Sequence, residues 1–248
     1  MRIIINCDDL GASREINDEI FDLMEQRRVT SATVMMNAPE TEDALRRMRK
    51  YPACSFGIHL NGTEFTPLTT HPGLGPLLNE KGEFARNLKR IALTSKIRNA
   101  VYFEWCAQIE RALEAGVAFS HIDSHEYVHT VPRLFGVVKR IQRKFHIRKV
   151  RITPNIFAPS ETKSLRLRAS KFAWNFALRH YVPTITTDKF CAFLVFYQQL
   201  QAGLRWPASI ELMCHPGRKK FAAETELLRS NWKATLAQDA RLINYNEL

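Results

Sequence analysis

Histidine and aspartate side chains gather in the segment 120–129, which reads Ser-His-Ile-Asp-Ser-His-Glu-Tyr-Val-His. The alternating pattern over residues 117–123 predicts a strand, and the polar side chains fall on it or just after its C-terminal end. Imidazoles and a carboxylate are ligand types that divalent metal ions prefer. Any one of these histidines alone is better explained as a capping or surface residue, so the metal-site interpretation needs support from elsewhere in the chain.

Two adjacent carboxylates, Asp8 and Asp9, directly follow the predicted strand 2–7. Burial disfavours the charged form of a carboxyl group, so two of them after a buried strand require a cation nearby. A helix N-cap explains one of these residues but not both. The pair therefore indicates a site that holds positive charge.

Three further strand ends carry side chains that could do chemistry: His59, Arg151 and His215. Alone, His59 reads as a core residue and Arg151 as surface charge. Beside a carboxylate cluster, however, a guanidinium is a group that keeps an aspartate ionised. These residues become informative only if the fold brings them together.

Strands and helices alternate about seven times, which is typical of a parallel sheet with helical crossovers. The predicted strands are 2–7, 31–36, 54–60, 117–123, 149–153, 184–187 and 209–214. The predicted helices are 13–27, 39–50, 95–115, 131–145, 161–181, 192–200 and 225–243. The connection 61–87 is unusually long, and loops of that length tend to be functional or disordered.

This alternation predicts an α/β fold of one domain over residues 1–248, a size common for β/α barrels. In a closed barrel the C-terminal ends of all strands form one face, where the candidate residues would meet. An open, doubly wound sheet would also gather strand ends. No G-x-G-x-x-G follows the first strand, however, which argues against a dinucleotide-binding sheet.

Composition narrows the setting of the protein. The five cysteines include no C-x-x-C pair, which favours free thiols and a cytoplasmic location. No apolar run approaches the length of a membrane span. Thirteen of the 36 Lys and Arg lie between Arg133 and Arg179, against one of the 25 acids, Glu161. Such a run is most often a solvated helix face, but it also suits an anionic surface such as phospholipid.

The basic region includes the predicted helix 161–181, which combines aromatic and basic side chains. We expect its aromatics to pack in the core. A basic amphipathic helix is also a candidate for contact with the inner face of a membrane. Nucleic acid is a poorer partner because no recognition motif accompanies the charge.

The motifs, in chain order, resemble those of the YdjC-like carbohydrate deacetylases, which include chitooligosaccharide and hopanoid-biosynthesis deacetylases. The matching segments are Cys7-Asp8-Asp9-Leu10-Gly11, Gly57-Ile58-His59-Leu60, His121-Ile122-Asp123-Ser124-His125 with His129, Arg151 near Pro154, and Cys214-His215-Pro216-Gly217. The resemblance covers essentially the whole chain. It implies a distorted seven-stranded, TIM-like β/α barrel and hydrolysis of an N-acetyl group from an amino sugar.

The resemblance also implies roles for individual residues. Asp9, His59 and His125 are the expected metal ligands, Asp8 the general base and His215 the general acid. Arg151 is expected to orient Asp8. The expected substrate residues are His129, Glu126 and Asp123, and Asp123 could also support a ligating histidine. Glu126 stands where the family often has a further histidine.

One carboxylate and two imidazoles leave open positions on a divalent ion, as catalysis requires. Zinc suits these ligands best, with magnesium as the alternative. Iron would suit the same set, so a non-haem iron oxygenase stays open, as does a non-catalytic glycan- or lipid-binding barrel. The paired aspartates and His215 favour hydrolysis. The acetylated sugar could be an oligosaccharide, a glycolipid or a lipid-linked glycan, and a homodimer is possible.

Overall fold

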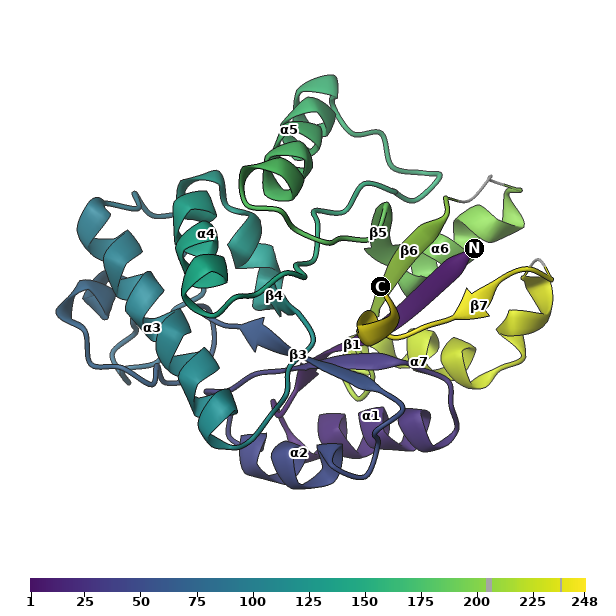
Figure 1. The fold of residues 1–248 in the computed structure, drawn as a ribbon, viewed down its shortest axis with the longest axis horizontal. Helices are drawn as coiled ribbons and strands as arrows, with labels where there is room; N and C mark the ends of the chain where they lie inside the picture. Colours follow the sequence, from purple (N-terminus) through teal and green to yellow (C-terminus); the bar gives the residue numbers. More distant parts are fainter. Residues whose placement is uncertain (204–206, 237) are drawn as a thin grey trace.

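The computed structural model describes residues 1–203, 207–236 and 238–248. Its central element is a curled sheet of parallel strands with helices packed around the outside (Figure 1). Within the described residues the sheet has seven strands; six follow the order β4-β3-β2-β1-β6-β5, and β7 pairs with β1. The strands are β1 (Arg2–Leu10), β2 (Ser31–Val34), β3 (Ser55–Leu60), β4 (Ile122–Ser124), β5 (Lys189–Ala192), β6 (Ser209–Cys214) and β7 (Arg241–Leu242).

Helices connect most of these strands and cover the outer side of the curved sheet (Figure 1). They are α1 (Arg14–Glu25), α2 (Thr41–Met48), α3 (Ser95–Glu114), α4 (Phe135–Lys144), α5 (Leu165–Tyr181), α6 (Phe193–Gln201) and α7 (Ala222–Arg229). This arrangement confirms the predicted distorted β/α barrel, with a sheet that curls without forming a continuous ring of ladders.

The first strand is the centre of the sheet because it is apolar and buried along almost its whole length. Eight of its nine residues are buried, including Ile3, Ile4 and Ile5. A strand covered on both faces reads as a continuous apolar run rather than an alternating one. Asp8 and Asp9 are buried within the last three residues of this strand, which ends at Leu10, so the chain delivers two carboxylates into the interior.

The part of the sheet between β4 and β5 differs from the prediction. The expected strand 149–153 forms only isolated bridges, from Val150 to Ile122 and from Lys149 to Ile185. The side chain of Asn175 satisfies the backbone N–H of Thr153, at 2.8 Å, in place of a neighbouring strand. The Asn175 side chain and Pro154, which lacks an N–H, therefore end the strand pairing at residue 153.

Two other predicted elements are wrong. The strand expected at 184–187 lies at 189–192, because Arg179 binds the Thr186 hydroxyl and the Thr187 carbonyl. The helix expected at 225–243 ends at residue 229, and residue 237 of it lies outside the described residues. Here Trp232 turns inward against Phe193, a tertiary contact that a helical pattern does not reveal.

The strand predicted at 117–123 is shorter and lies at 122–124. The predicted core packing of the α5 aromatics is also only partly right: Trp174 is buried, but Phe172 and Phe176 are exposed. None of the helices in the described ranges is both long and apolar enough to cross a bilayer.

Candidate metal centre

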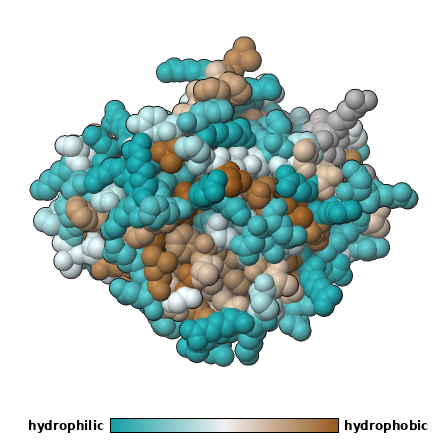
Figure 2. Space-filling model, in the orientation of Figure 1, coloured by the Kyte–Doolittle hydropathy of each residue, from teal (hydrophilic) through white to brown (hydrophobic). Residues whose placement is uncertain are grey.

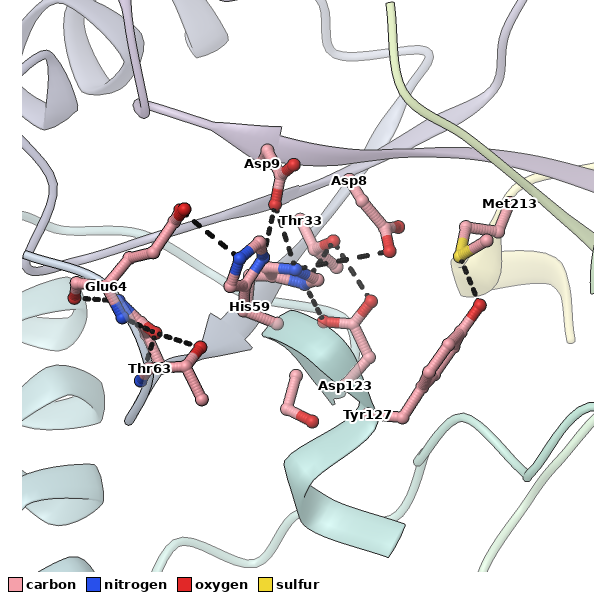
Figure 3. Close-up of polar contacts among 12 residues, drawn as sticks. Asp8, Asp9, Thr33, His59, Thr63, Glu64, Asp123, Tyr127 and Met213 are labelled. Carbon is pink, nitrogen blue, oxygen red and sulfur yellow. Dashed lines mark hydrogen bonds and ion pairs between the residues drawn. The ribbon is translucent and has the colours of Figure 1, made fainter. Parts of the chain in front are cut away.

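Three side chains with metal-ligand chemistry converge at the C-terminal ends of β1, β3 and β4: Asp9, His59 and His125. The Oδ1 atom of Asp9 lies 2.7 Å from Nδ1 of His125 and 3.3 Å from Nε2 of His59. All three side chains are buried, and Figure 3 shows the Asp9 carboxylate directed toward His59. The fold therefore brings together the three candidate ligands that the family resemblance implies.

Each imidazole in this cluster has its second nitrogen against another carboxylate. Nδ1 of His59 lies 2.7 Å from Asp123, and Nε2 of His125 lies 3.2 Å from Glu64. Strand pairing places His59 directly beside Asp123 in the parallel register of β3 and β4. A carboxylate behind each histidine fixes the ring orientation and the tautomer, which is the usual support of a metal-binding imidazole.

The electrostatics of the cluster favour a cation. Burial opposes a charge on His59, but the carboxylates of Asp123 and Asp8 raise its pKa to about 10. Burial also opposes ionisation of Asp9, yet hydrogen bonds from His125 and His59 hold its pKa well below the usual value. The site thus favours positive charge at an imidazole and keeps the adjacent carboxylate ionised. Its nitrogen and oxygen donors are of the types that bind a divalent ion.

Unusual backbone conformations lie at or next to two of the candidate ligands. Asp9 has a positive φ of 68°, so its side chain leaves the strand direction. His125 begins a short 3₁₀ segment, His125–Thr130, in which Glu126 (φ 49°) and Tyr127 (φ 57°) are also left-handed. Positive φ is uncommon outside glycine and often marks functional positions.

Arg151 is a fully buried guanidinium that joins three carboxylates. It donates two parallel hydrogen bonds of 2.7 Å to Asp8, and its Nη1 lies 2.6 Å from Asp123. Its Nε donates to Glu211 at 2.8 Å. The predicted pairing of Arg151 with Asp8 is therefore present in the geometry. Asp8 also accepts a bond from Asn6, and its Oδ2 lies 4.0 Å from Nε2 of His59.

Glu211 lies below this cluster and differs from the other carboxylates. Burial raises the pKa of Glu211 to about 7, although Arg151 and the hydroxyl of Tyr245 act in the opposite direction. Tyr245 donates a hydrogen bond to it. One guanidinium does not balance three buried carboxylates, so Glu211 is the member that can carry a proton near neutral pH.

His215 directly follows β6 and is close enough to feel the charges of Asp8 and Asp9. Burial lowers the pKa of this imidazole. Its ring stacks on Phe221 at 4.5 Å between centroids, and its Nδ1 is buried with no hydrogen-bond partner among the described residues. The backbone N–H of His215 donates to Glu224, which fixes the turn. An imidazole fixed in place with an unpaired nitrogen is suited to proton transfer.

The three expected substrate residues lie in different environments. Glu126 is partly exposed. His129 is fully buried, with one nitrogen at Ser124 and the other 3.1 Å from the carbonyl oxygen of Arg151. Asp123 is also fully buried, and it bonds His59 and the hydroxyl of Thr33. The geometry leaves Glu126 accessible and makes Asp123 a support for the His59 imidazole.

Two charged residues of the site are absent from the sequence prediction. Glu64 contacts His125, and Arg218 donates a 2.6 Å hydrogen bond to Oδ2 of Asp9. Arg218 also approaches Glu64, at 3.5 Å (Figure 3 shows Glu64 beside the cluster). Glu64 belongs to the long connection 61–87, whose length predicts a functional or a disordered loop. Arg218 follows His215-Pro216-Gly217 directly, so proximity to that motif was its signal.

Comparison with known proteins gives a consistent result across the chain. The family model described as YdjC-like protein matches residues 2–243. A carbohydrate deacetylase of Halalkalibacterium halodurans is 33% identical over 219 residues, which is 87% of this chain and 85% of that protein. A carbohydrate deacetylase of Geobacillus stearothermophilus is 38% identical over 144 residues, covering 58% of this chain and 57% of the relative.

Among solved structures, a protein of Enterococcus faecalis V583 named for a suggested role in cellobiose-phosphate cleavage has the same fold. The TM-score is 0.77 over 99% of this chain and 98% of that one, at 23% sequence identity. An uncharacterised protein of Agrobacterium tumefaciens C58 aligns with a TM-score of 0.51 over 100% of this chain and 89% of the other, at 12% identity. These two likenesses concern the fold.

Proposed function

Because the chain belongs to the YdjC-like family, we propose that it is a metal-dependent carbohydrate deacetylase that removes the N-acetyl group of an amino sugar. The observation that carries this proposal is the cluster of Asp9, His59 and His125, in which each imidazole has a carboxylate on its second nitrogen. Metal-binding imidazoles are almost always supported in this way, so the arrangement is the one that a cation site needs.

Asp9, His59 and His125 would hold the ion, and zinc is the proposed metal, with magnesium as the alternative. A divalent ion in this position supplies Lewis acidity, which polarises an amide carbonyl and acidifies water. The buried, ionised Asp9 provides one negative charge, so a bound cation keeps net positive charge for this purpose.

We assign Asp8 the role of general base. Its two hydrogen bonds from Arg151 and one from Asn6 fix the plane of the carboxylate next to the proposed ligands. A base fixed in this way can accept the proton of an attacking water without first reorganising. Arg151 orients Asp8, and its guanidinium nitrogens are already paired with Asp8, Asp123 and Glu211.

His215 is the proposed general acid for the departing amine. Because burial lowers its pKa, the imidazole is neutral at pH 7 and must first accept a proton. It can then deliver that proton to the sugar nitrogen as the C–N bond breaks, which makes the amine a better leaving group. Glu126 is the proposed sugar contact, and Asp123 and His129 position the site from below.

The test is release of acetate by the wild-type protein and by the Asp8→Asn variant, after chelation and separate addition of zinc, magnesium, manganese and iron. We expect metal-dependent release in the wild type and a loss of about 10²–10⁴-fold in Asp8→Asn, with the bound metal retained. The substrates tested should include N-acetylated oligosaccharides, glycolipids and lipid-linked sugars. The proposal specifies an N-acetylated amino sugar but not the molecule that carries it.

Stoichiometric metal without acetate release from any acceptor would contradict the proposal. Oxygen consumption with iron would then favour the oxygenase, and glycan binding without turnover would favour a binding barrel. A cytoplasmic location is proposed with the activity, in line with five cysteines that are all free.

A further inference from the structure

Helix α5 carries a second apolar side that faces away from the protein. Leu165, Phe172 and Phe176 are 82%, 72% and 56% exposed. Their spacing of seven and four residues puts them on one side of the helix. In Figure 2 brown atoms protrude at the top of the molecule, where Figure 1 shows α5. We call these three residues the α5 ridge.

Packing of the helix on its own protein does not account for the ridge. The opposite side of α5 already provides that packing through Trp174 and Leu178, which are buried. Asn175 on the same inner side binds Thr153 by two hydrogen bonds, of 2.8 and 3.0 Å. Large exposed apolar side chains cost solubility unless they bind something, so the ridge marks an interaction surface.

Positive charge surrounds the ridge. Arg166 and Arg168 are exposed on the same helix, and neither forms an ion pair with a carboxylate in the part of the chain that the structure describes. Beside the ridge lies a pocket of about 620 Å³, between α5 and the chain at 154–157, lined by Leu165, Phe172, Arg168 and Lys171 among others. The acid on its rim, Asp188, already accepts hydrogen bonds from Ser209.

We propose that the α5 ridge, with Arg166 and Arg168, docks the protein on the surface of an anionic lipid bilayer. Phenyl and leucyl side chains enter the boundary between headgroups and acyl chains, and basic side chains bind the lipid phosphates. A second copy of this chain is a poorer partner, because it would bring the same cations toward one another. The proposal does not depend on the deacetylase chemistry.

The docked orientation has a consequence for the metal centre. The inner side of α5 contacts the site region directly: Asn175 binds Thr153, two residues after Arg151, and Trp174 packs edge-on against His129 at 5.8 Å. If α5 lies on a bilayer, only this helix and the residues packed on its inner side would separate the region of the candidate metal centre from the membrane.

The test is co-sedimentation of the full chain with phosphatidylglycerol vesicles and, separately, phosphatidylcholine vesicles at low salt. We expect binding to the anionic vesicles, little to the neutral ones, and release at about 0.5 M salt because the charges are screened. Phe172→Ser with Phe176→Ser should reduce the vesicle partition coefficient at least about tenfold. Arg166→Gln with Arg168→Gln should reduce it by a similar factor.

Matched controls test whether α5 is specific. Phe103→Ser removes an exposed phenyl from α3 (46% exposed), and Arg46→Gln with Lys50→Gln removes two exposed cations from the α2 region. Both should bind vesicles like the wild type. Circular dichroism and the thermal midpoint identify any variant that fails to fold. The Arg166→Gln, Arg168→Gln variant gives a second test of the proposal in which the aromatic side chains are unchanged.

Three results would overturn the proposal: no binding of the wild type to anionic vesicles, equal losses in the control variants, or undiminished binding of both α5 variants. Size-exclusion chromatography adds a fourth. If the wild type is a dimer and the Phe172→Ser, Phe176→Ser variant is a monomer, the ridge is a subunit interface. Acetate release is not measured here, so failure of the enzymatic proposal cannot mimic any of these outcomes.

Discussion

At the scale of single residues, the distinctive feature of the centre is the pairing of each imidazole with its own carboxylate. Asp123 is inaccessible behind His59, whereas Glu64 comes from the long connection 61–87 and is less deeply buried. Glu64 also contacts two cations, Arg218 and Arg86. Glu64 therefore links the His125 imidazole to two basic side chains, Arg218 and Arg86.

We predict that Glu64→Gln weakens binding of the metal by about 10- to 100-fold, because the amide supports the His125 imidazole less well than a carboxylate. Competition with a chromophoric chelator measures this affinity. Glu80→Gln, an exposed acid in the same connection, is the control and should leave the affinity unchanged. Equal metal affinity in Glu64→Gln and the wild type would show that Glu64 does not support the ligand.

At the scale of elements, β3 and β4 position His59 and Asp123 only because their neighbours fit closely. Gly57 in β3 faces the ring of His121, and a Cβ there would lie 2.5 Å from Cε1 of that ring. The ring cannot retreat, since it stacks on Tyr245 with centroids 3.4 Å apart. Glycine in the Gly-Ile-His motif is thus required by packing beneath the metal site.

Accordingly, Gly57→Ala should lower the free energy of unfolding by roughly 1–3 kcal/mol or more, because the added methyl overfills a closed space. Urea denaturation measures the change. Gly136→Ala in α4 is the matched control: no heavy atom lies within 4 Å of its added Cβ, and alanine is the better helix former, so it should stabilise by up to about 1 kcal/mol. A neutral Gly57→Ala would contradict the packing argument.

Elements with strong local patterns were predictable. The apolar runs of β1 and β6 and the chemical residues at their ends follow from sequence, because buried parallel strands are continuous apolar segments. The sequence could not show that residues 149–153 would lose their ladder, since a distant side chain, Asn175, takes the place of a strand. The inward turn at Trp232 is likewise a tertiary effect.

The convergence of the candidate ligands was predictable for a similar reason, and their assignment as ligands followed from the family resemblance. The contributions of Glu64 and Arg218 were not predicted. Parallel strands end at one edge, so Asp9, His59 and His125 had to approach one another once the strands were identified. Arg218 and Glu64 lie in connections, whose sequences lack the hydrophobic periodicity that identifies helices and strands. Their positions depend on how the loops close over the edge.

At the scale of the whole molecule, the C-terminal segment closes the end of the sheet opposite the metal centre. β7 pairs with the beginning of β1, and Tyr245 inserts its ring next to His121 while its hydroxyl binds Glu211. The two ends of the chain lie close together in Figure 1. Titration of the buried groups in this region therefore bears on global stability.

Burial lowers the pKa of His121 to about 3 in the folded protein, against 6.5 for an ordinary histidine. Between pH 3 and pH 6.5, His121 is protonated in the unfolded chain but neutral in the folded protein. The contribution of His121 to the free energy of unfolding is therefore fully present above pH 6.5 and falls as the pH decreases. From pH 7.5 to pH 5 this single group should cost about 2 kcal/mol of unfolding free energy.

The variant His121→Phe keeps a flat ring on Tyr245 but cannot titrate. Its unfolding free energy relative to the wild type should therefore rise by about 2 kcal/mol when urea denaturation is repeated at pH 5 instead of pH 7.5. Titration of Glu211 and of other groups is common to both proteins and cancels in the comparison. If the difference in unfolding free energy between His121→Phe and the wild type stays constant with pH, His121 does not take up a proton on unfolding.

The left-handed backbone of Asp9 restricts which sequences can build this centre. At φ 68° aspartate and asparagine are tolerated far better than bulky or branched side chains, and glycine is free of strain. Exchanging Asp9 for glutamate or a β-branched residue would therefore strain the backbone as well as change the ligand. Variation among relatives, and laboratory selection for a new metal, should leave this position almost fixed and act instead on Glu64 and Arg218, whose loops can accept new side chains.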